Sequence, residues 1–298
     1  MCGLAGLQRL DRDHATGLSG AAMATTLAHR GPDAVGDWTC PSGTLELGFR
    51  RLAIRDLDPR ANQPMVSASG RTVLVFNGEV YNTDELAARF CPDCRLETTS
   101  DTEVLLEAFD RRGPDVLDHV NGMFAAVFYR RESRTVWLAR DGAGMKPLYL
   151  YHGEGFVAFA SELRGFSGLR LEPDPRQVPF FLHFGYVPAP GTFYQRVSQL
   201  RPGETLVLRH GRVVARHRFH DPLSLSWGSQ PDVVENEIER LVDDAVIRRT
   251  VSDVPLGTFL SGGVDSALVA AALAEGGRGE LPAFTVSFDE PGYNEGPQ

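Results

Sequence analysis

Short runs of apolar residues, separated by Gly, Pro and Asp, recur along the sequence up to about residue 218. Residues 72–76, 123–129 and 135–139 are typical, because they are rich in the β-branched and aromatic side chains that favour extended strands. Helical spacing interrupts these runs in residues 19–29 and 101–112, where apolar residues recur on one face. The pattern therefore predicts a sheet domain with helices packed on it.

The pattern changes near residue 219. Residues 219–232 are rich in Pro, Ser, Trp and Gly without any period, which predicts a linker between a domain at 2–218 and a second one at 233–298. The second part reads as an amphipathic helix, a buried strand, an alanine-rich helix and a second strand, at 233–249, 255–260, 267–275 and 283–288. This order is the opening of a parallel α/β sheet, which binds ligands at the carboxyl ends of its strands.

Composition narrows the classes of function. The 298 residues are 42% hydrophobic and 23% charged, with a net charge of −9 and a pI near 5.4. An acidic chain without a basic stripe is not expected to bind nucleic acid. Lys146 is the only lysine, so Schiff-base catalysis by a lysine is not expected.

The cysteines and the apolar runs bear on location. No apolar run has the length of a membrane span and the amino terminus becomes charged early, so we expect a cytoplasmic protein without a membrane partner. Cys2, Cys40, Cys91 and Cys94 are too few for a disulfide framework. Cys91 and Cys94 have the spacing of a redox or zinc pair, but no matching second pair exists, so we expect a loop after a helix at 83–90.

Cys2 is a candidate nucleophile. Removal of Met1 would make it the first residue and place its thiol beside its own α-amine, which titrates at about 7.7–8.0 and can take the thiol proton. Gly3 would let the backbone approach a substrate closely. The alternative is a small unreactive cysteine that happens to be second.

Other segments supply what hydrolysis of a carboxamide such as that of glutamine requires. Asn77-Gly78, at the end of the strand 72–76, offers a side-chain amide and a backbone N–H to an oxyanion, although the same dipeptide is common in turns. Arg51 and Asp101 are candidates for the α-carboxylate and the α-ammonium of free glutamine. Ser100-Asp-Thr-Glu103 is also a capping box that would open the helix 101–112, and both roles of Asp101 can coexist.

A second candidate site lies between the strand 255–260 and the helix 267–275. Ser261-Gly-Gly-Val-Asp-Ser266 places backbone N–H groups and a helix amino terminus at one point, which favours a phosphate. It lacks the Gly-Lys-Ser/Thr of a Walker loop. The alternative is a glycine-rich turn in which Asp265 and Ser266 act only as caps.

Several segments in order resemble known families. Those at 1–6 (MCGLAG), 29–33 (HRGPD), 51–55 (RLAIR), 76–82 (FNGEVYN) and 100–103 (SDTE) resemble the class II glutamine amidotransferases. Those at 139–149 (ARDGAGMKPLY), 159–162 (FASE) and 184–188 (FGYVP) resemble, within that class, the asparagine synthetases. The resemblance implies a four-layered αββα N-terminal-nucleophile hydrolase domain, followed by the beginning of a parallel α/β domain of the ATP-pyrophosphatase type.

The resemblance also implies roles for residues. In the first domain it makes Cys2 the nucleophile and assigns glutamine to Arg51, Ile54, Arg55, Asn77, Gly78, Glu79 and Asp101, with Asn77 and Gly78 as the oxyanion hole. In the second it assigns ATP to Leu260, Ser261, Gly262, Gly263, Asp265, Ser266 and Val286, with Asp265 near a Mg²⁺ ion that accompanies the ATP. His29 is expected to be a structural histidine in a turn, because the α-amine already supplies a base.

The implied activity is ATP-dependent synthesis of asparagine from aspartate, with ammonia supplied by glutamine and a homodimer as one possible assembly. Adenylation makes a carboxylate electrophilic, because AMP is a good leaving group. Two alternatives remain open. One is amidation of another carboxylate in secondary metabolism, and the other is glutamine hydrolysis alone, because the sequence to Gln298 holds only the opening of the second domain.

Overall fold

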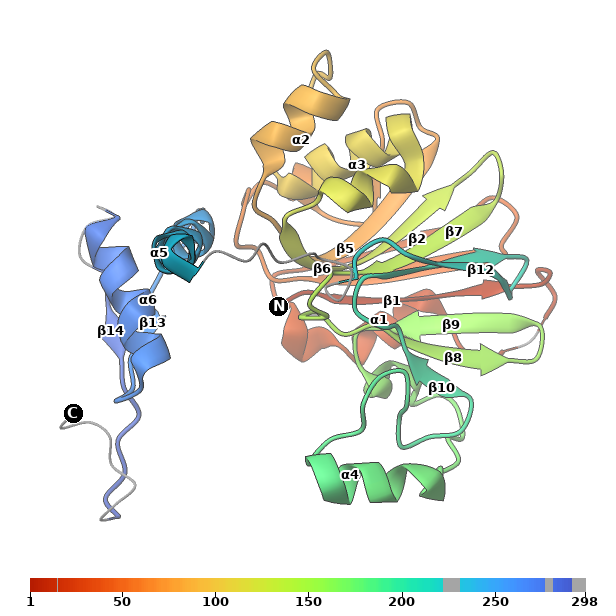
Figure 1. The fold of residues 1–298 in the computed structure, drawn as a ribbon. Helices are drawn as coiled ribbons and strands as arrows, with labels where there is room; N and C mark the ends of the chain where they lie inside the picture. Colours follow the sequence, from red (N-terminus) through yellow and green to blue (C-terminus); the bar gives the residue numbers. More distant parts are fainter. Residues whose placement is uncertain (15, 222–230, 277–280, 291–298) are drawn as a thin grey trace. The chain divides into compact units, whose positions relative to one another are not determined.

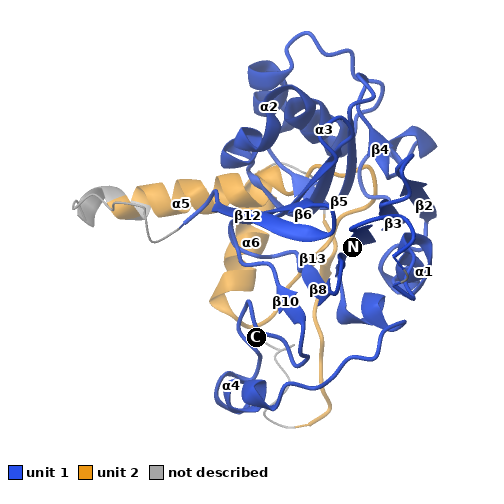
Figure 2. Cartoon of the chain, turned by 90° about the vertical axis from the view of Figure 1, so that its right-hand side faces the viewer, with its two compact units in different colours: residues 1–225 blue, residues 226–298 orange. Residues whose placement is uncertain are grey.

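The computed structural model describes residues 1–14, 16–221, 231–276 and 281–290. The chain forms two compact units, Met1–Leu225 and Ser226–Gln298, which are coloured separately in Figure 2. The predicted linker at 219–232 falls mostly on residues 222–230, which lie outside the described residues. Each unit is described by itself.

The first unit contains two six-stranded antiparallel sheets (Figure 1). The first sheet has the order β10-β8-β9-β1-β3-β2. Its strands are β1 (Gly3–Arg9), β2 (Ala34–Thr39), β3 (Leu45–Arg51), β8 (Tyr149–Gly153), β9 (Phe156–Ala160) and β10 (Val197–Gln199). The second sheet has the order β12-β11-β7-β6-β5-β4. Its strands are β4 (Met65–Val66), β5 (Thr72–Val80), β6 (Gly122–Arg130), β7 (Thr135–Arg140), β11 (Glu204–Arg209) and β12 (Arg212–Arg218).

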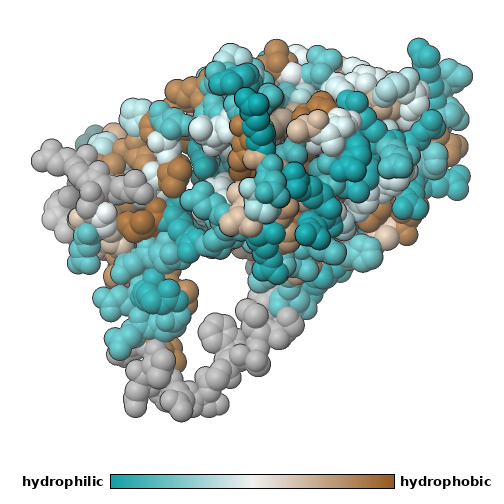
Figure 3. Space-filling model, turned by 90° about the horizontal axis from the view of Figure 1, so that it is seen from above, coloured by the Kyte–Doolittle hydropathy of each residue, from teal (hydrophilic) through white to brown (hydrophobic). Residues whose placement is uncertain are grey.

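Helices cover the outer faces of both sheets. The helix α1 (Gly20–Thr25) packs on β1 and β3, while α2 (Thr83–Phe90) packs on α3 (Asp101–Arg112), which lies on β5. Figure 1 shows α2 and α3 above the second sheet, and Figure 3 shows hydrophilic and hydrophobic residues interspersed on the face seen from that side. The other helices in the described part of this unit are η1 (Ala28–Arg30), η2 (Pro59–Ala61), η3 (Gly113–His119), η4 (Leu163–Phe166), η5 (Pro175–Gln177) and α4 (Val178–Phe184).

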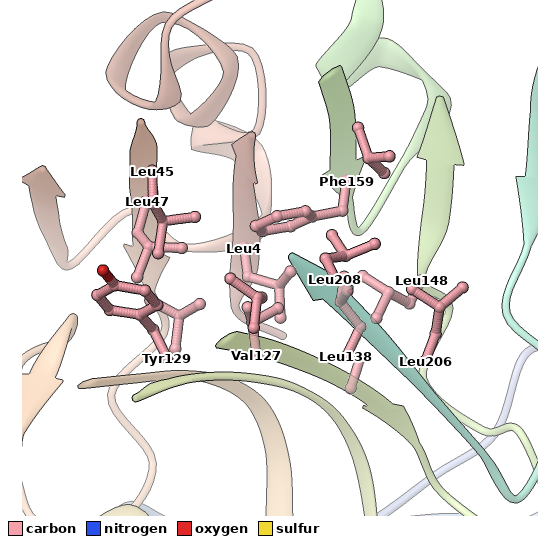
Figure 4. Packing of buried hydrophobic residues seen from close by; sticks show 14 of the residues in the cluster. Leu4, Leu45, Leu47, Val127, Tyr129, Leu138, Leu148, Phe159, Leu206 and Leu208 are labelled. Atoms are coloured by element: carbon pink, nitrogen blue, oxygen red, sulfur yellow. The ribbon is translucent and has the colours of Figure 1, made fainter. Parts of the chain in front are cut away.

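Three buried clusters hold these layers together. Leu4 and Leu47 of the first sheet meet Val127 and Leu138 of the second in the cluster between the sheets (Figure 4). A second cluster joins the outer face of the second sheet to α3, and a third joins the outer face of the first sheet to α1. Each fully buried side chain of this size contributes about 1.5–3 kcal/mol. The order helix, sheet, sheet, helix confirms the predicted αββα architecture.

The structure corrects several local predictions in the first unit. The strand expected to end at residue 76 continues to Val80, because Asn77 and Gly78 pair with Ala125 and Phe124 of β6. The Asn-Gly dipeptide is therefore not a turn. The helix expected over 19–29 is broken into α1 and η1, with Thr26 and Leu27 between them.

The capping box at the start of α3 is only half formed. Ser100 caps the helix, since its hydroxyl accepts a hydrogen bond from the N–H of Thr102 at 3.2 Å. The carboxylate of Glu103 does not return to Ser100. It accepts the N–H groups of Glu97 and Thr98 instead, at 2.9 and 2.7 Å, because the preceding loop turns back over the first turn of the helix.

The second unit begins with α5 (Pro231–Arg248), which packs on α6 (Val264–Glu275). The strands β13 (Thr258–Phe259) and β14 (Ala283–Phe284) pair in parallel on either side of α6 in the sequence. The predicted parallel β-α-β order is therefore present. None of the helices in the described part of the chain is both long and apolar enough to cross a membrane.

Three details of the second unit differ from the predictions. Both strands are two residues long rather than six, and α6 begins at Val264, three residues early, with Gly263 as its cap. The strand at 255–260 was expected to be buried, but Phe259 is 78% exposed. The reason is that the described part of this sheet has only two strands, so few side chains are available to cover Phe259.

Candidate active site

A pocket of about 260 Å³ opens in the first unit, where the chain enters β1, leaves β3, follows β5 and starts α3. The side chains and backbone that line it include every residue predicted for glutamine and for catalysis. These residues are Cys2, Arg51, Ile54, Arg55, Asn77, Gly78, Glu79 and Asp101. The tertiary structure thus brings together residues that are up to 99 positions apart, from Cys2 to Asp101.

Cys2 lies at the entrance to β1 and is partly buried. Its Sγ donates to the carbonyl of Leu52 at 3.6 Å and accepts the N–H of Leu52 at 3.5 Å. Burial raises the pKa of the Cys2 thiol, although the hydrogen bond from Leu52 opposes the shift. A thiol in this setting is held mainly in its protonated form and requires a base before it can act as a nucleophile.

Asn77 is a polar residue with an unsatisfied donor. It is 1% exposed, it lines the pocket, and its Nδ2 has no hydrogen-bond partner among the described residues. Leaving a buried amide N–H unpaired costs about 1–3 kcal/mol. Such a donor is therefore poised to receive an oxygen from a ligand in the pocket.

The backbone of Gly78 faces the same open edge of β5. Along a strand, N–H groups two residues apart point in the same direction. The N–H of Phe76 donates to Oε1 of Gln63 at 2.6 Å, and the N–H of Val80 donates to Oδ2 of Asp101 at 2.8 Å. The N–H of Gly78 lies between these two on the same side, next to the amide of Asn77. A side chain at this position is excluded, because a Cβ would lie 2.1 Å from the carbonyl oxygen of Met123.

Asp101 is a buried carboxylate at the first position of α3. Besides its bond from Val80, its Oδ2 lies 3.9 Å from Nη1 of Arg55. Burial raises the pKa of Asp101, and the guanidinium of Arg55 opposes this shift without cancelling it. A cation that entered the pocket would relieve the cost of burying this charge.

Arg51 has a structural task that the sequence did not reveal. Its Nη1 donates to the carbonyl of Asp58 at 3.1 Å and to Oδ1 of Asn62 at 2.8 Å. Its Nη2 donates to the carbonyls of Arg55 and Asp56. Arg51 therefore closes the loop 52–62, which supplies one wall of the pocket.

Asp56 ties this loop to the start of α3. It adopts a positive φ of 52°, a conformation that Asp tolerates better than most residues. Its Oδ2 accepts the N–H of Thr99 at 2.7 Å, two residues before Asp101. The hydrogen bond between Asp56 and Thr99 thus connects the loop 52–62 to the start of α3, where Asp101 lies.

Sequence reasoning missed Gln63, Arg30 and Lys146. The side-chain amide of Gln63 binds both the N–H and the carbonyl of Phe76. Arg30 donates from Nε to the carbonyl of Cys2 at 2.9 Å and from Nη1 to Glu162 at 2.7 Å. Lys146 also lines the pocket. The signal that could have found it is that it is the only lysine in the sequence.

His29 does not line the pocket. It lies in η1 with its Nε2 3.0 Å from a carboxylate oxygen of Glu162. This position agrees with the expectation of a structural histidine.

In the second unit, a pocket of about 280 Å³ is lined by Leu260, Ser261, Ser266 and Val286 together with neighbouring residues. Gly262, Gly263 and Asp265 belong to the same loop but do not line this pocket. The hydroxyls of Ser261 and Ser266 are 2.9 Å apart, and Oγ of Ser266 also accepts the N–H of Ser261 at 3.1 Å. The loop is therefore closed by its own hydroxyls.

Candidate metal ligands are few. The described part of the chain contains no group of three or more His, Cys, Asp or Glu side chains placed to hold a metal ion. Cys91 ends α2, and the N–H of Cys94 donates to its carbonyl at 3.0 Å, so the pair lies on a turn, with both cysteines as free thiols. This matches the loop expected at this position.

Comparison with known proteins gives the fold its class. A solved structure, the glutamine phosphoribosylpyrophosphate amidotransferase of Bacillus subtilis complexed with ADP and GMP, superimposes with a TM-score of 0.54, at 18% identity over 95% of this chain and 65% of that chain. At this identity the match shows the fold alone, which is that of an amidotransferase of the N-terminal-nucleophile type. Residues 1–220 match the glutamine amidotransferase domain family, and the chain belongs to this family.

The remainder of the chain also has relatives. Residues 237–298 match the asparagine synthase family. Over 92% of its length the chain is 30% identical to asparagine synthetase (glutamine-hydrolyzing) 1 of Bacillus subtilis strain 168 and, again over 92%, 34% identical to asparagine synthetase (glutamine-hydrolyzing) of Asparagus officinalis. The chain spans 43% and 42% of these two relatives, which is less than half of either.

Proposed function

We propose that this chain carries the glutamine-hydrolysing site and the start of the ATP-binding domain of a glutamine-dependent asparagine synthetase. The observation that carries the proposal is the unpartnered Nδ2 of Asn77 in the same pocket as Cys2. A thiol beside an unused amide donor is the arrangement that attack on a carboxamide requires. The two family matches and the synthetase relatives support the same conclusion.

In the proposed reaction, removal of Met1 frees the α-amine of Cys2, which takes the proton of the thiol. The sulfur attacks the carboxamide carbon of glutamine, and Asn77 Nδ2 and the N–H of Gly78 stabilise the oxyanion. The C–N bond then breaks and ammonia leaves with the proton that the amine had taken. Water hydrolyses the resulting thioester to glutamate and restores the thiol.

Two charges are proposed to select free glutamine. Asp101 receives the α-ammonium, which compensates its buried carboxylate. Arg51 receives the α-carboxylate, while Glu79 and the backbone at Ile54 and Arg55 complete the pocket. Because both terminal nitrogens of Arg51 already bind the loop 52–62, this role requires one of those bonds to be exchanged. Glutamine binding and the position of the loop are therefore coupled in this proposal.

The second unit is proposed to bind ATP at the loop 261–266, with Leu260 and Val286 beside the nucleotide. The residues fit a phosphate, since the loop has two glycines and opens α6, where N–H groups are unpaired by the helix itself. ATP would supply the adenylyl group that makes a carboxylate electrophilic. Asp265 is proposed to assist a Mg²⁺ ion on the phosphates.

The acceptor and the setting complete the proposal. Aspartate as acceptor is drawn from the relatives, and amidation of another carboxylate or glutamine hydrolysis alone are the alternatives. We further propose a cytoplasmic enzyme, consistent with four free thiols, with a homodimer as one possible assembly and no nucleic acid or membrane as partner. Asparagine formation from aspartate, ATP and free ammonia, assayed with a protein that carries the complete second domain, tests the acceptor, since free ammonia bypasses Cys2. An amide formed only on another acid would favour the first alternative.

The proposal is tested by replacing Cys2. We expect Cys2→Ala to abolish glutamate release from glutamine, whereas Cys40→Ala, which changes a buried cysteine outside the pocket, should retain it. Mass spectrometry of the mature protein should show that Met1 has been removed. Unchanged glutamate release in Cys2→Ala would overturn the glutaminase assignment.

A further inference from the structure

Lys146 is a buried lysine in the wall of the Cys2 pocket. It is 7% exposed, and it is the only lysine in a chain with 30 basic lysine and arginine residues. Arginine therefore serves at every other such position. An ammonium differs from a guanidinium in being a compact point charge on a flexible stem. The burial of its positive charge in the pocket wall points to a task there.

The backbone around Lys146 is held in place by two buried residues. The carboxylate of Asp141 accepts the N–H groups of Phe124, Ala143, Met145 and Lys146, at 3.1, 3.1, 2.9 and 3.0 Å. Arg140 donates from Nε to the carbonyl of Lys146 at 2.8 Å. The ammonium is thus delivered to the pocket by a loop that has little freedom to move.

The ammonium of Lys146 donates a hydrogen bond to the sulfur of Met1, at 3.2 Å. Among the described residues, no carboxylate forms an ion pair with it within 4.0 Å. Burying a charge without a partner is costly. Removal of Met1 takes away the sulfur that Nζ of Lys146 binds among the described residues. The same cleavage makes the α-amine of Cys2 the new amino terminus.

The backbone of Cys2 is fixed independently of Met1. Arg30 holds the carbonyl of Cys2 at 2.9 Å, and the next residue, Gly3, begins β1. The new amine is therefore kept beside the pocket. In the structure, burial lowers the pKa of the terminal amine of Met1, and both Arg30 and Lys146 lower it further.

Building on the function proposed above, we propose that Lys146 is a positioning residue whose ammonium, released by the loss of Met1, keeps the α-amine of Cys2 uncharged so that it accepts the thiol proton. A fixed cation disfavours a second positive charge nearby. The amine would thus be available as a base at neutral pH. The α-amine that accepts the thiol proton holds it weakly, which favours transfer of this proton to the departing ammonia.

The other charges around the amine and Lys146 are consistent with this role. Arg30 acts in the same direction as Lys146 on the terminal amine, while Asp33 and the Cys2 thiolate oppose it. Burial, and to a smaller extent Arg30, lower the pKa of Lys146, while Glu79, Asp141 and Cys2 oppose that shift. Asp141 already accepts four N–H groups. These four N–H groups largely compensate the negative charge of Asp141, so its effect on the ammonium of Lys146 is reduced.

The test compares Lys146→Met with Lys146→Arg, using the pH profile of kcat/KM for glutamine. Methionine fills similar space without charge, so the acidic limb should move upward by about one pH unit. Lys146→Arg should keep the limb near that of the unmodified protein. Met145→Leu, at an adjacent residue that is 56% exposed, should leave the limb unchanged. If Lys146→Met prevents folding, Lys146→Gln provides a second neutral variant.

A second measurement does not depend on glutaminase activity. Competitive acylation of the Cys2 α-amine, followed by mass spectrometry across the pH range, reports the amine's own titration, and this titration should move upward in Lys146→Met. An unchanged titration, or an unchanged limb with uniformly lower activity or a higher KM, would overturn the proposal. Failure of Lys146→Arg to restore the limb would also overturn it. Failure of the glutaminase assignment itself would appear instead as activity retained in Cys2→Ala.

Discussion

The two candidate sites of this chain differ in how complete their polar groups are. At the Cys2 pocket, Asn77 presents an Nδ2 that has no partner among the described residues, and the charges of Asp101 and Lys146 are buried in the wall. At the loop 261–266, the hydroxyls of Ser261 and Ser266 bind each other and the loop backbone, while Ser261 is exposed and Ser266 is half-buried. One site is built around unsatisfied groups and the other is satisfied internally.

This difference indicates how each site is prepared for its ligand. In the first pocket, folding of the two-sheet core has already buried the polar groups. A ligand can therefore bind to these groups without rearranging the protein. The loop must exchange its internal hydrogen bonds for those of a phosphate, so the net gain is smaller. Removal of one polar side-chain group should therefore have a larger effect on activity at the first site than on ligand binding at the second.

The largest effect is expected at Asn77. Asn77→Ala removes an oxyanion donor and should lower kcat for glutamine hydrolysis by about 10²–10³, with a smaller change in KM. Because Nδ2 has no partner in the described structure, its loss should have little effect on thermal stability. Asn121→Ala, at an exposed position, is the control and should keep full activity. An unchanged kcat in Asn77→Ala would show that the unpaired Nδ2 is not an oxyanion donor, and the proposed difference between the two sites would fail.

An intermediate effect is expected at Asp101. Asp101→Asn keeps an oxygen for the N–H of Val80 but loses the charge for the α-ammonium, so KM for glutamine should rise by about 30-fold or more, the equivalent of at least about 2 kcal/mol. Steady-state kinetics measures this change. Asp93→Asn, on the exposed turn after α2, should leave KM unchanged. A rise in KM below about threefold would argue against the charge pair.

The same variant has a pH signature. Because burial raises the pKa of Asp101, the folded state binds its proton more tightly than the unfolded state does. Stability therefore falls as pH rises from the unfolded pKa through the folded pKa, and the loss is complete above the folded value. Asp101→Asn should remove this loss, so its Tm should exceed that of the parent protein at neutral pH, by about 2–4 °C per kcal/mol, and the difference should shrink in acid. A lower Tm at neutral pH would contradict this sign.

The smallest effect is expected at the loop of the second unit. Ser266→Ala removes the hydroxyl that holds Ser261 and should weaken ATP binding by about threefold to tenfold, the range of a single hydrogen bond. Glutamine hydrolysis in the same variant should stay within about twofold of the parent, which provides the internal control. Calorimetry with ATP and a glutaminase assay measure the two. Equal losses in both assays would show that the sites are not separable in this way.

Much of the first unit could be predicted from its sequence. The helix 101–112 and the strands near 123–129 and 135–139 were expected because apolar residues at a fixed period must face one core. The end of β5 could not be predicted in this way. Asn-Gly favours a turn locally, but pairing with β6 keeps both residues extended. The buried strand expected in the second unit failed for a related reason, since burial depends on what covers a strand and not on its own residues.

The sequence by itself determined which chemical groups this protein has: a cysteine at the second position, an Asn-Gly pair, a glycine-rich loop before a helix and one lysine. Only the tertiary structure decided which of these groups meet, which lose their solvent and which are already paired. The physical reason is that hydrogen bonding and the effect of burial on charge depend on distance and surroundings. Arg51 and Lys146 show this most clearly, because contacts that the sequence pattern does not reveal fix their roles. The contacts of Arg51 are with the loop 52–62, and that of Lys146 is with Met1, 145 positions away.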